Sequence, residues 1–420
     1  GPGRITQFQS AYPGARTTSE VSTAPVGVDE MTFGMPRPWQ VARVEVSTES
    51  VPQDIDRVVA TIRAASESAR IPSPRKPWLE ELAPTYALNR LPQRRDTELL
   101  LGVVDDPDHQ DQHPEYFRPD DEGHIAFYGA SGSGKSTALR SLAIAAAITP
   151  RSGPVDVYAL DAAGGGLAML ESLPHVGAVV EADDDERVTR LLRYLTDLID
   201  TRSERYAAAR AATITDYRRI SGNQEEPRIL LLVDGIGSFR TEYEKNSDGL
   251  AVLDLFQRIL VDGRGVGVHV AAGAERPQAI STSMAGTFQR KVVLRQTDEE
   301  GYMYFNLPKD VLSPKSPPGR AMQVDRKDEE LQLAILGDNV NVLAQSRLVE
   351  SFGHYLERRG RTRPTGVGKL PDELSTSALP ETVAGLPTLG MSSDTLGPWG
   401  YTPVGAVLVA GQAESGGVAA

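Results

Sequence analysis

The feature that most constrains the fold is a short glycine-rich run, Gly129-Ala130-Ser131-Gly132-Ser133-Gly134-Lys135-Ser136. It follows an apolar stretch of strand length at residues 125–128 and opens an Ala- and Leu-rich stretch at residues 137–148 that is typical of a helix. In this context the backbone can turn its N–H groups around phosphate oxygens, an approach that a Cβ atom would obstruct. The sequence therefore predicts a P-loop within an α/β fold.

Each part of this run has a predicted role in binding ATP with Mg²⁺. The Lys135 ammonium is expected to reach the β- and γ-phosphates, and the Ser136 hydroxyl to bind Mg²⁺. The N-terminus of the following helix adds favourable partial positive charge. Thr137 is counted with the loop, although we expect it to be a helix residue rather than a ligand. The predicted cofactor-binding residues are Gly129, Ala130, Ser131, Gly132, Ser133, Gly134, Lys135, Ser136, Thr137 and Asp234.

A carboxylate is predicted near the metal at Asp234, which ends the apolar run Arg228-Ile-Leu-Leu-Leu-Val-Asp234. A carboxylate at the end of such a strand helps to hold Mg²⁺ in P-loop enzymes, so Ser136 and Asp234 are the predicted metal-associated pair. Gly235 follows directly. Because glycine has no side chain to take a proton from water, the sequence predicts that binding and hydrolysis are separable.

Between about residues 99 and 348, apolar runs of strand length alternate with helix patterns. This rhythm is typical of a mostly parallel sheet with helices on both faces. The clearest helix pattern places on one face Val188, Leu191, Leu192, Leu195, Leu198 and Ile199. The expected strands are 99–104, 124–128, 155–160, 229–233, 266–272 and 291–295, with a terminal ribbon at 320–324 and 330–336.

The composition of the flanking segments predicts four parts along the chain. Residues 1–84 are proline-rich and irregular, with one helix pattern at Ile55, Val58, Val59 and Ile62. We expect them to be the end of a preceding module plus a strap. Residues 85–359 are the expected ATPase domain, and residues 360–399 a linker rich in Pro, Gly, Ser and Thr. Residues 400–420 are expected to be a terminal strand or the start of a following module of a longer protein.

Composition argues against several other kinds of site. With 44 basic and 57 acidic residues the net charge is −13, which would repel a phosphate backbone, so nucleic acid is not an expected partner. The absence of cysteine excludes disulfides and thiolate metal sites. No apolar run approaches the roughly 20 residues that span a bilayer, so no membrane contact is predicted for this piece. His109, His113 and His124 suggest a metal site, but the Asp-rich run around the first two favours a solvated loop.

Beyond the P-loop, an ordered series of motifs runs through residues 85–350. Its members include Leu160-Asp161 before Gly164-Gly165-Gly166, Asp216-Tyr217-Arg218, Gly263-Arg264-Gly265, Glu275-Arg276-Pro277 and Pro318-Gly319-Arg320. This series resembles the FtsK/SpoIIIE-type ATPases, and within them the EccC motor of type VII (ESX) secretion. The resemblance implies a RecA/FtsK-like P-loop NTPase fold of the additional-strand type. It also implies a string of three ATPase modules, of which this chain would hold the second.

Two departures from the family pattern concern hydrolysis. Active members carry Asp-Glu where this chain has Asp234-Gly235, and a Thr-Gln or Ser-Gln pair that senses the γ-phosphate where it has Ala274-Glu275. The resemblance therefore implies degraded hydrolysis, with Glu275 at the sensor position. Arg264 falls where the family can present an arginine finger to a neighbouring module. Such an arginine acts on the neighbour's phosphates, so its target cannot lie in this active site.

Three functions remain open at this point. The resemblance favours an ATP-binding, weakly or non-hydrolysing regulatory module of a type VII protein-secretion motor. The partners it implies are neighbouring ATPase modules of the same chain, secreted WXG100-type substrates and other secretion-complex subunits, with a hexamer as one form of the full assembly. It implies a cytoplasmic piece of a protein anchored at the plasma membrane. The alternatives are an active FtsK-like DNA translocase, and a docking module for a secreted protein's C-terminal signal with a vestigial P-loop.

Overall fold

The computed structural model describes residues 54–71, 79–149, 152–245, 247–309, 312–371, 373–392 and 396–400, without the side chains of residues 247, 248, 327 and 328. The chain divides into two units, Gly1–Pro77 and Trp78–Ala420. In the first unit the predicted helix is confirmed as α1, Asp54–Ser68. Its apolar side chains are 40–59% exposed, at Ile55, Val58, Val59 and Ile62.

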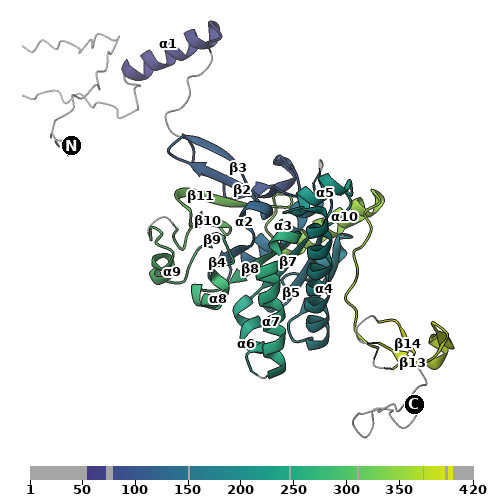
Figure 1. Cartoon of the computed structure of the whole chain (residues 1–420). Helices are drawn as coiled ribbons and strands as arrows, with labels where there is room; N and C mark the ends of the chain where they lie inside the picture. The colour runs from purple at the N-terminus through teal and green to yellow at the C-terminus, as the bar shows by residue number, and fades with distance from the viewer. Residues whose placement is uncertain are drawn as a thin grey trace, which may run out of the picture. The chain divides into compact units, whose positions relative to one another are not determined.

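The second unit is built on one 11-stranded sheet with the order β3-β2-β11-β10-β9-β4-β8-β7-β5-β6, and β1 pairs with β11 (Figure 1). The run from β9 to β6 is parallel, whereas β10, β11, β2 and β3 extend it with antiparallel pairs. The strands are β1 (Tyr86–Ala87), β2 (Leu99–Asp106), β3 (Asp111–Phe117), β4 (Ile125–Tyr128), β5 (Val155–Asp161), β6 (Val176–Glu181), β7 (Arg228–Asp234), β8 (Val268–Ala274), β9 (Arg290–Leu294), β10 (Arg320–Gln323) and β11 (Arg326–Ile335).

Helices cover both faces of the sheet, which confirms the predicted fold class (Figure 1). Alternate residues of β5 point to opposite faces, so Tyr158 and Leu160 join one apolar cluster while Val157 and Ala159 join the other. The first cluster contains α4, α6 and α7, and the second contains α3. The helices of this unit are α2 (Pro119–Glu122), α3 (Lys135–Ala147), α4 (Asp185–Ala209), α5 (Ile214–Ser221), α6 (Ile236–Tyr243), α7 (Ser247–Asp262), α8 (Thr282–Ala285), α9 (Glu299–Tyr304) and α10 (Val342–Arg358).

The predicted elements of the nucleotide-binding half are confirmed, and the main differences lie at the two edges of the sheet. Strand β3 includes His113, the last residue of a run that we expected to be a solvated loop, and the following Pro114. Strand β6, which contains Gly177, was not predicted at all. Both are edge strands and need backbone partners on one side only, so a proline or a glycine is tolerated there and the apolar signal is weak.

The stretch after α10, expected to be a linker, packs beside β5 of the large sheet before it forms a small sheet of its own. Tyr158 Oη donates to the Thr365 carbonyl at 2.9 Å, and the Val367 side chain is buried. Three short strands then form an antiparallel sheet: β12 (Thr382–Val383), β13 (Leu386–Met391) and β14 (Pro398–Gly400). Residues 400–420 were expected to form a further strand or module start, and all but the first lie outside the described residues.

None of the helices in the described part of the chain is long and apolar enough to cross a membrane.

Candidate nucleotide site

The predicted site residues converge at the carboxyl edge of the parallel strands, where ligands commonly bind in open α/β sheets. Strand β4 leads into the P-loop, β7 ends at Asp234 and β8 ends at Ala274, next to Glu275. The register pairs Tyr128 with Ala274, which places Glu275 beside the start of the P-loop. The structure therefore brings together the predicted binding residues and the predicted sensor position.

The P-loop is held by backbone hydrogen bonds to three neighbouring segments. Gly129 N donates to the Ala274 carbonyl at 3.0 Å, and Ala130 N donates to the Arg295 carbonyl at 2.8 Å. The Ser133 carbonyl accepts from Gly319 N at 2.8 Å. Gly134, the N-cap of α3, has φ +116° and lies so near this segment that a Cβ would come within 2.9 Å of Gly319 N. Only glycine fits at position 134, so the loop is fixed before any ligand binds.

The Lys135 side chain folds back over its own loop. Its Nζ donates to the Gly129 carbonyl at 2.7 Å and to the Ala130 carbonyl at 3.0 Å. Burial lowers the pKa of Lys135, while the negative charges of Glu275 and Asp234 act in the opposite direction. The ammonium therefore already lies at the mouth of the loop, where the negative charges of Glu275 and Asp234 partly compensate its positive charge.

Asp234 is fully buried, and neither of its carboxylate oxygens has a hydrogen bond of normal geometry within the described part of the chain. Burial raises the pKa of Asp234, and the nearby Ser136 hydroxyl partly opposes that rise without forming such a bond. Two glycines line the carboxylate, since a Cβ would lie 3.2 Å from Oδ2 at Gly166 and 2.9 Å from Oδ1 at Gly273. Unpaired buried oxygens beside a hydroxyl form the hard donor set that Mg²⁺ prefers, so Ser136 and Asp234 fit the metal of MgATP.

Gly235 shows why a catalytic glutamate cannot simply be restored at this position. Its φ of +75° lies in the left-handed region, and it is the N-cap of α6. A Cβ there would lie 3.0 Å from the Ala162 carbonyl oxygen and 3.3 Å from Ala163 Cβ. The backbone of this turn therefore favours glycine, and glycine has no side chain that could accept a proton.

Glu275 is exposed and lies at the rim of a pocket of about 320 Å³ that also involves Gln296 and Asp298. Its Oε2 is 3.2 Å from the place that a Cβ on Gly237 would occupy, so the side chain leans over the start of α6. Its charge also acts on Lys135. Glu275, the predicted sensor residue, therefore adds negative charge near the predicted phosphate site.

Two charged residues of the site were not predicted. Asp161 ends β5 and is the register partner of Asp234 on β7. Its carboxylate accepts from Ala163 N at 3.0 Å and from Leu167 N at 2.8 Å. Arg140 on α3 donates to the Gly166 carbonyl and to Thr137 Oγ1, each at 2.9 Å. The sequence signals were the acidic residue before three glycines and the arginine one turn after the P-loop lysine and serine.

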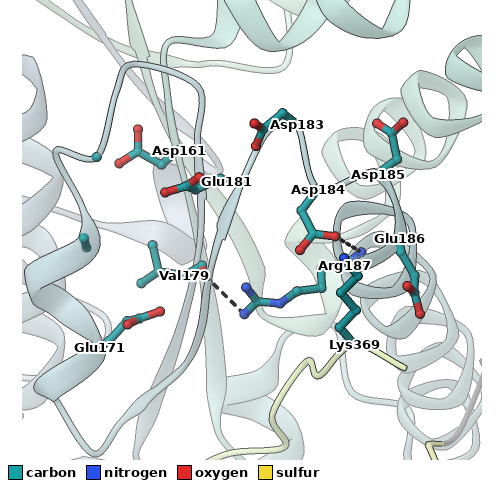
Figure 2. A pocket seen from close by; sticks show the side chains of 12 residues that line it. Asp161, Glu171, Val179, Glu181, Asp183, Asp184, Asp185, Glu186, Arg187 and Lys369 are labelled. Atoms are coloured by element: carbon teal, nitrogen blue, oxygen red, sulfur yellow. Dashed lines mark hydrogen bonds between the residues drawn. The ribbon is translucent and has the colours of Figure 1, made fainter. Parts of the chain in front are cut away.

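An acidic pocket of about 590 Å³ also borders this glycine-rich turn (Figure 2). Asp161 and Gly165 line it, together with the start of α4. Asp161 and Glu181 lie close together in Figure 2, in agreement with their pairing across β5 and β6. Asp184 caps α4 by accepting from Arg187 N at 3.2 Å, so this acidic run stabilises the N-terminus of a helix.

Arg264 lies at the opposite edge of the sheet from the P-loop, just before β8 begins. Its Nε donates to the Asp120 carbonyl at 3.1 Å, and its Nη2 to the Asp121 carbonyl at 2.8 Å. The guanidinium thus holds the end of α2. It cannot reach the phosphate site of its own module, and its role as a finger toward a neighbour stays a prediction.

The histidines that suggested a metal site lie apart. His109 pairs with Asp106 at 2.7 Å, and His113 lies 3.6 Å from Asp111. His124 is buried, and its Nε2 lies 2.8 Å from the Leu260 carbonyl. Among the described residues, no group of three or more His, Asp or Glu side chains could hold a metal ion.

Comparison with known proteins agrees with this geometry. Residues 92–305 match the FtsK/SpoIIIE family. The chain is 28% identical to the ESX-1 secretion system protein EccCb1 of Mycolicibacterium smegmatis over 337 residues, which is 76% of this chain and 54% of that protein. It is 26% identical to the ESX secretion system protein YukB of Bacillus subtilis, over 89% of this chain and 24% of that protein. The chain thus spans between about a quarter and about half of the length of these relatives.

Solved structures extend the comparison to the fold. EssC (ATPases 2 and 3) from Geobacillus thermodenitrificans matches with a TM-score of 0.66 at 20% identity, over 77% of this chain and 62% of that one. Thermomonospora curvata EccC (ATPases 2 and 3), solved in complex with a signal sequence peptide, matches with a TM-score of 0.60 at 25% identity, over 77% and 59%. A P-loop at the edge of a helix-covered parallel sheet and the match over half of its residues agree: the chain belongs to the FtsK/SpoIIIE family, with ESX secretion ATPases as its named relatives.

Proposed function

We propose that this chain is an ATP-binding module of a type VII secretion ATPase that holds its nucleotide with little or no turnover. The observation that carries the proposal is a contrast between two adjacent residues. Asp234 is buried with both oxygens unpaired beside Ser136, as a metal-associated carboxylate needs. Gly235, where active relatives carry the proton acceptor, sits in a backbone conformation that selects glycine.

Binding rests on groups that are already in place. The loop amides and the α3 N-terminus favour anionic phosphates, and the Lys135 ammonium can exchange its two carbonyl partners for phosphate oxygens without a large movement. Ser136 and Asp234 would hold Mg²⁺, which when bound neutralises charge on the β- and γ-phosphates. The site is thus equipped for affinity.

Hydrolysis lacks a suitable base among the described residues of the site. Asp161 uses both carboxylate oxygens to accept backbone N–H groups. Asp234 lies beside Ser136 and would be engaged with Mg²⁺. Glu275 remains, but its charge acts on Lys135, and proton transfer also requires a side chain within reach of the attacking water. Glutamate at the sensor position also opposes the negative charge of the phosphates.

Retention without turnover has a structural use. A ligand that binds only the folded state stabilises it by RT ln(1 + [L]/Kd), which is about 4 kcal/mol when ATP is present at 1,000 times its Kd. Bound nucleotide would therefore stiffen the sheet edge where β4, β5, β7 and β8 end. We propose that this edge supports contacts with neighbouring ATPase modules and other secretion-complex subunits, in an assembly, such as a hexamer, on the cytoplasmic side of the plasma membrane.

A second candidate is a docking module for the C-terminal signal of a secreted WXG100-type protein. The observation that favours it is the relative solved with a signal sequence peptide. This role is compatible with ATP binding, because the intact Lys135 and Ser136 argue against a vestigial P-loop. An active DNA translocase is less favoured, since the net charge is −13 and Gly235 replaces the proton acceptor.

The test is to purify the chain, to release and quantify bound nucleotide, and to measure turnover with Mg²⁺. We expect about one ATP per chain and negligible hydrolysis. The Lys135→Ala variant should lose the nucleotide and part of the thermal stability. Rapid hydrolysis stimulated by duplex DNA would overturn the proposal in favour of a translocase. Nucleotide-free protein, with a Lys135→Ala variant of unchanged stability, would overturn it in favour of a docking module.

A further inference from the structure

Arg140 connects the first turns of α3 to a loop from another part of the sheet. It is half-buried, and two of its guanidinium nitrogens donate in different directions. Nη1 donates to the Gly166 carbonyl and Nη2 to Thr137 Oγ1, each at 2.9 Å. A planar guanidinium can hold two such partners at a fixed separation, which an ammonium cannot do. Arg140 therefore ties the loop after β5 to the helix that carries the P-loop.

The loop, residues 162–167, is fixed at its ends by the two buried carboxylate-bearing strands. Ala162 N donates to the backbone carbonyl of Asp234 at 2.9 Å. The Asp161 side chain accepts from Ala163 N at 3.0 Å and from Leu167 N at 2.8 Å. Between these anchors, Gly164 and Gly165 have φ values of +94° and +83°. Arg140 supplies a side-chain hydrogen bond to the glycine-rich part of this loop, at Gly166.

The position of Gly166 matters because it forms a wall of the predicted metal site. A Cβ at Gly166 would lie 3.2 Å from Asp234 Oδ2 and 3.3 Å from both Cβ and Oγ of Ser136. The backbone of the loop therefore lies against the two side chains that would hold Mg²⁺. A loop that moved outward would open this wall to water and leave Ser136 and Asp234 less well positioned.

Arg140 also supplies charge where it is needed. Asp161 and Asp234 lie side by side at the ends of β5 and β7, and both are almost inaccessible to solvent. Buried carboxylates are costly unless cations or hydrogen bonds compensate them. Together with Lys135, Arg140 provides that compensation from α3, so its removal would affect the charge balance as well as the loop.

We propose that Arg140 is a positioning residue of the nucleotide site, which holds Gly166 against Ser136 and Asp234 and so sets how strongly nucleotide binding depends on Mg²⁺. This inference rests on the proposed function, because it requires that the P-loop binds ATP. Residues that orient metal ligands without touching the metal commonly change metal affinity by about 10- to 100-fold when they are replaced.

The experiment measures the Kd of ATP by calorimetry, with Mg²⁺ and with EDTA, for the full chain and its variants. The ratio of the two Kd values reports the contribution of Mg²⁺. We expect Arg140→Ala to reduce this ratio by about tenfold. Arg140→Lys should fail to restore it, because an ammonium lacks the planar pair of nitrogens that holds Gly166 and Thr137 at a fixed separation. The control is Arg219→Ala on α5, an exposed arginine whose guanidinium pairs with Asp216 of the same helix, which should leave the ratio unchanged.

Hydrogen exchange of the nucleotide-free protein provides a readout that does not depend on activity. In Arg140→Ala, the amides of Ala163 and Leu167 should exchange faster, whereas those of the β7 core should not. An unchanged Kd ratio in Arg140→Ala, with wild-type binding intact, would overturn this inference alone and leave Arg140 a purely structural residue. A wild-type chain that binds no ATP in either condition would overturn the proposed function, and this inference with it.

Discussion

Asp161 and Asp234 are register partners at the ends of neighbouring parallel strands, yet their carboxylates have opposite surroundings. Asp161 accepts two backbone N–H groups, at 3.0 and 2.8 Å, and so stabilises a loop. Asp234 accepts no hydrogen bond of normal geometry in the described part of the chain, although it is fully buried. The fold keeps one carboxylate satisfied and the other available, a difference that separates a structural aspartate from one suited to a metal.

This difference predicts opposite effects of the same substitution on stability. Burial raises the pKa of Asp234, so its ionised form destabilises the fold at neutral pH, and the penalty is relieved as the pH falls through the folded-state pKa. Asp234→Asn should therefore raise the Tm of nucleotide-free protein at pH 7, by about 2–4 °C for each kcal/mol recovered. Asp161→Asn should lower it, because the NH₂ group that replaces one carboxylate oxygen cannot accept a hydrogen bond from a backbone N–H.

Thermal unfolding with and without MgATP checks both substitutions. MgATP should raise the Tm of the wild type, and most of this rise should be absent in Asp234→Asn. A lower Tm of nucleotide-free Asp234→Asn at pH 7, or unchanged stabilisation by MgATP, would contradict the assignment of Asp234 to the metal.

A second prediction concerns Gly235 and has a matched control in the chain. Gly235 and Gly222 have nearly identical φ values, +75° and +76°, but only Gly235 has neighbours within reach of a Cβ. Gly222→Ala should cost about 1 kcal/mol for the left-handed conformation alone. Gly235→Ala should cost more, because Ala162 and Ala163 must also move. Denaturant unfolding of the two variants measures the difference, and equal costs would show that the turn has room for a side chain.

The same geometry predicts that hydrolysis cannot be restored by one substitution. Gly235→Glu introduces a proton acceptor but also forces the turn after β7 out of its conformation. We expect a less stable protein with no gain in turnover, as measured by release of phosphate under saturating MgATP. A clear increase in the rate would show that the missing acceptor is the only defect and that the backbone adapts readily.

How far the sequence predicts this site depends on whether the relevant contacts are local. The P-loop and α3 were predicted because the strand, the glycines, Lys135 and the helix are contiguous in sequence. Their spacing alone predicts the phosphate-binding loop. The adjacency of Asp161 and Asp234 was not, because it depends on β5 and β7 being neighbours in the sheet. The direction of the Arg140 side chain was also not predictable, since it depends on where the loop after β5 returns.

The strands at the sheet edges were missed for a different reason. Strand β3 begins with polar residues and contains Pro114, so its signal resembles a loop. Its pairing with β2 supplies the hydrogen bonds that the sequence pattern does not reveal. The cap of α4, by contrast, is a local contact, because Asp184 directly precedes the helix and accepts from its Arg187 N.

A further prediction tests the negative charge of Glu275 near the phosphates. Glu275→Gln should tighten ATP binding by a few-fold, about 1 kcal/mol or less, because the side chain is exposed and its charge is screened. Glu300→Gln, in the same pocket, is the control, because Glu300 is not among the charges that act on Lys135. Calorimetry at low and high salt checks this: the gain should shrink as salt rises. A gain of equal size in both variants would point to net charge rather than to the position of Glu275.

The last prediction concerns acid stability and rests on His124. Its Nδ1 accepts from Val270 N at 2.9 Å while its Nε2–H donates to the Leu260 carbonyl, an arrangement that requires the neutral ring. Burial lowers the pKa of His124 to about 4. The unfolded chain, with a pKa near 6.5, therefore binds more protons in this range, so stability falls as the pH drops from 6.5 toward 4. A shift of this size corresponds to roughly 3 kcal/mol.

His124→Phe should lower the stability at pH 7, because Val270 N loses its acceptor, but it should also flatten the loss of stability between pH 6.5 and 4. His109→Gln is the control of opposite sign. The pKa of exposed His109 is raised by its hydrogen bond to Asp106, so any stability it contributes is present at acid pH and is lost as the pH rises through that pKa. Urea unfolding of the three proteins at several pH values separates these effects. An acid slope in His124→Phe as steep as that of the wild type would assign the loss to other groups, because a neutral, buried imidazole at this position must contribute to it.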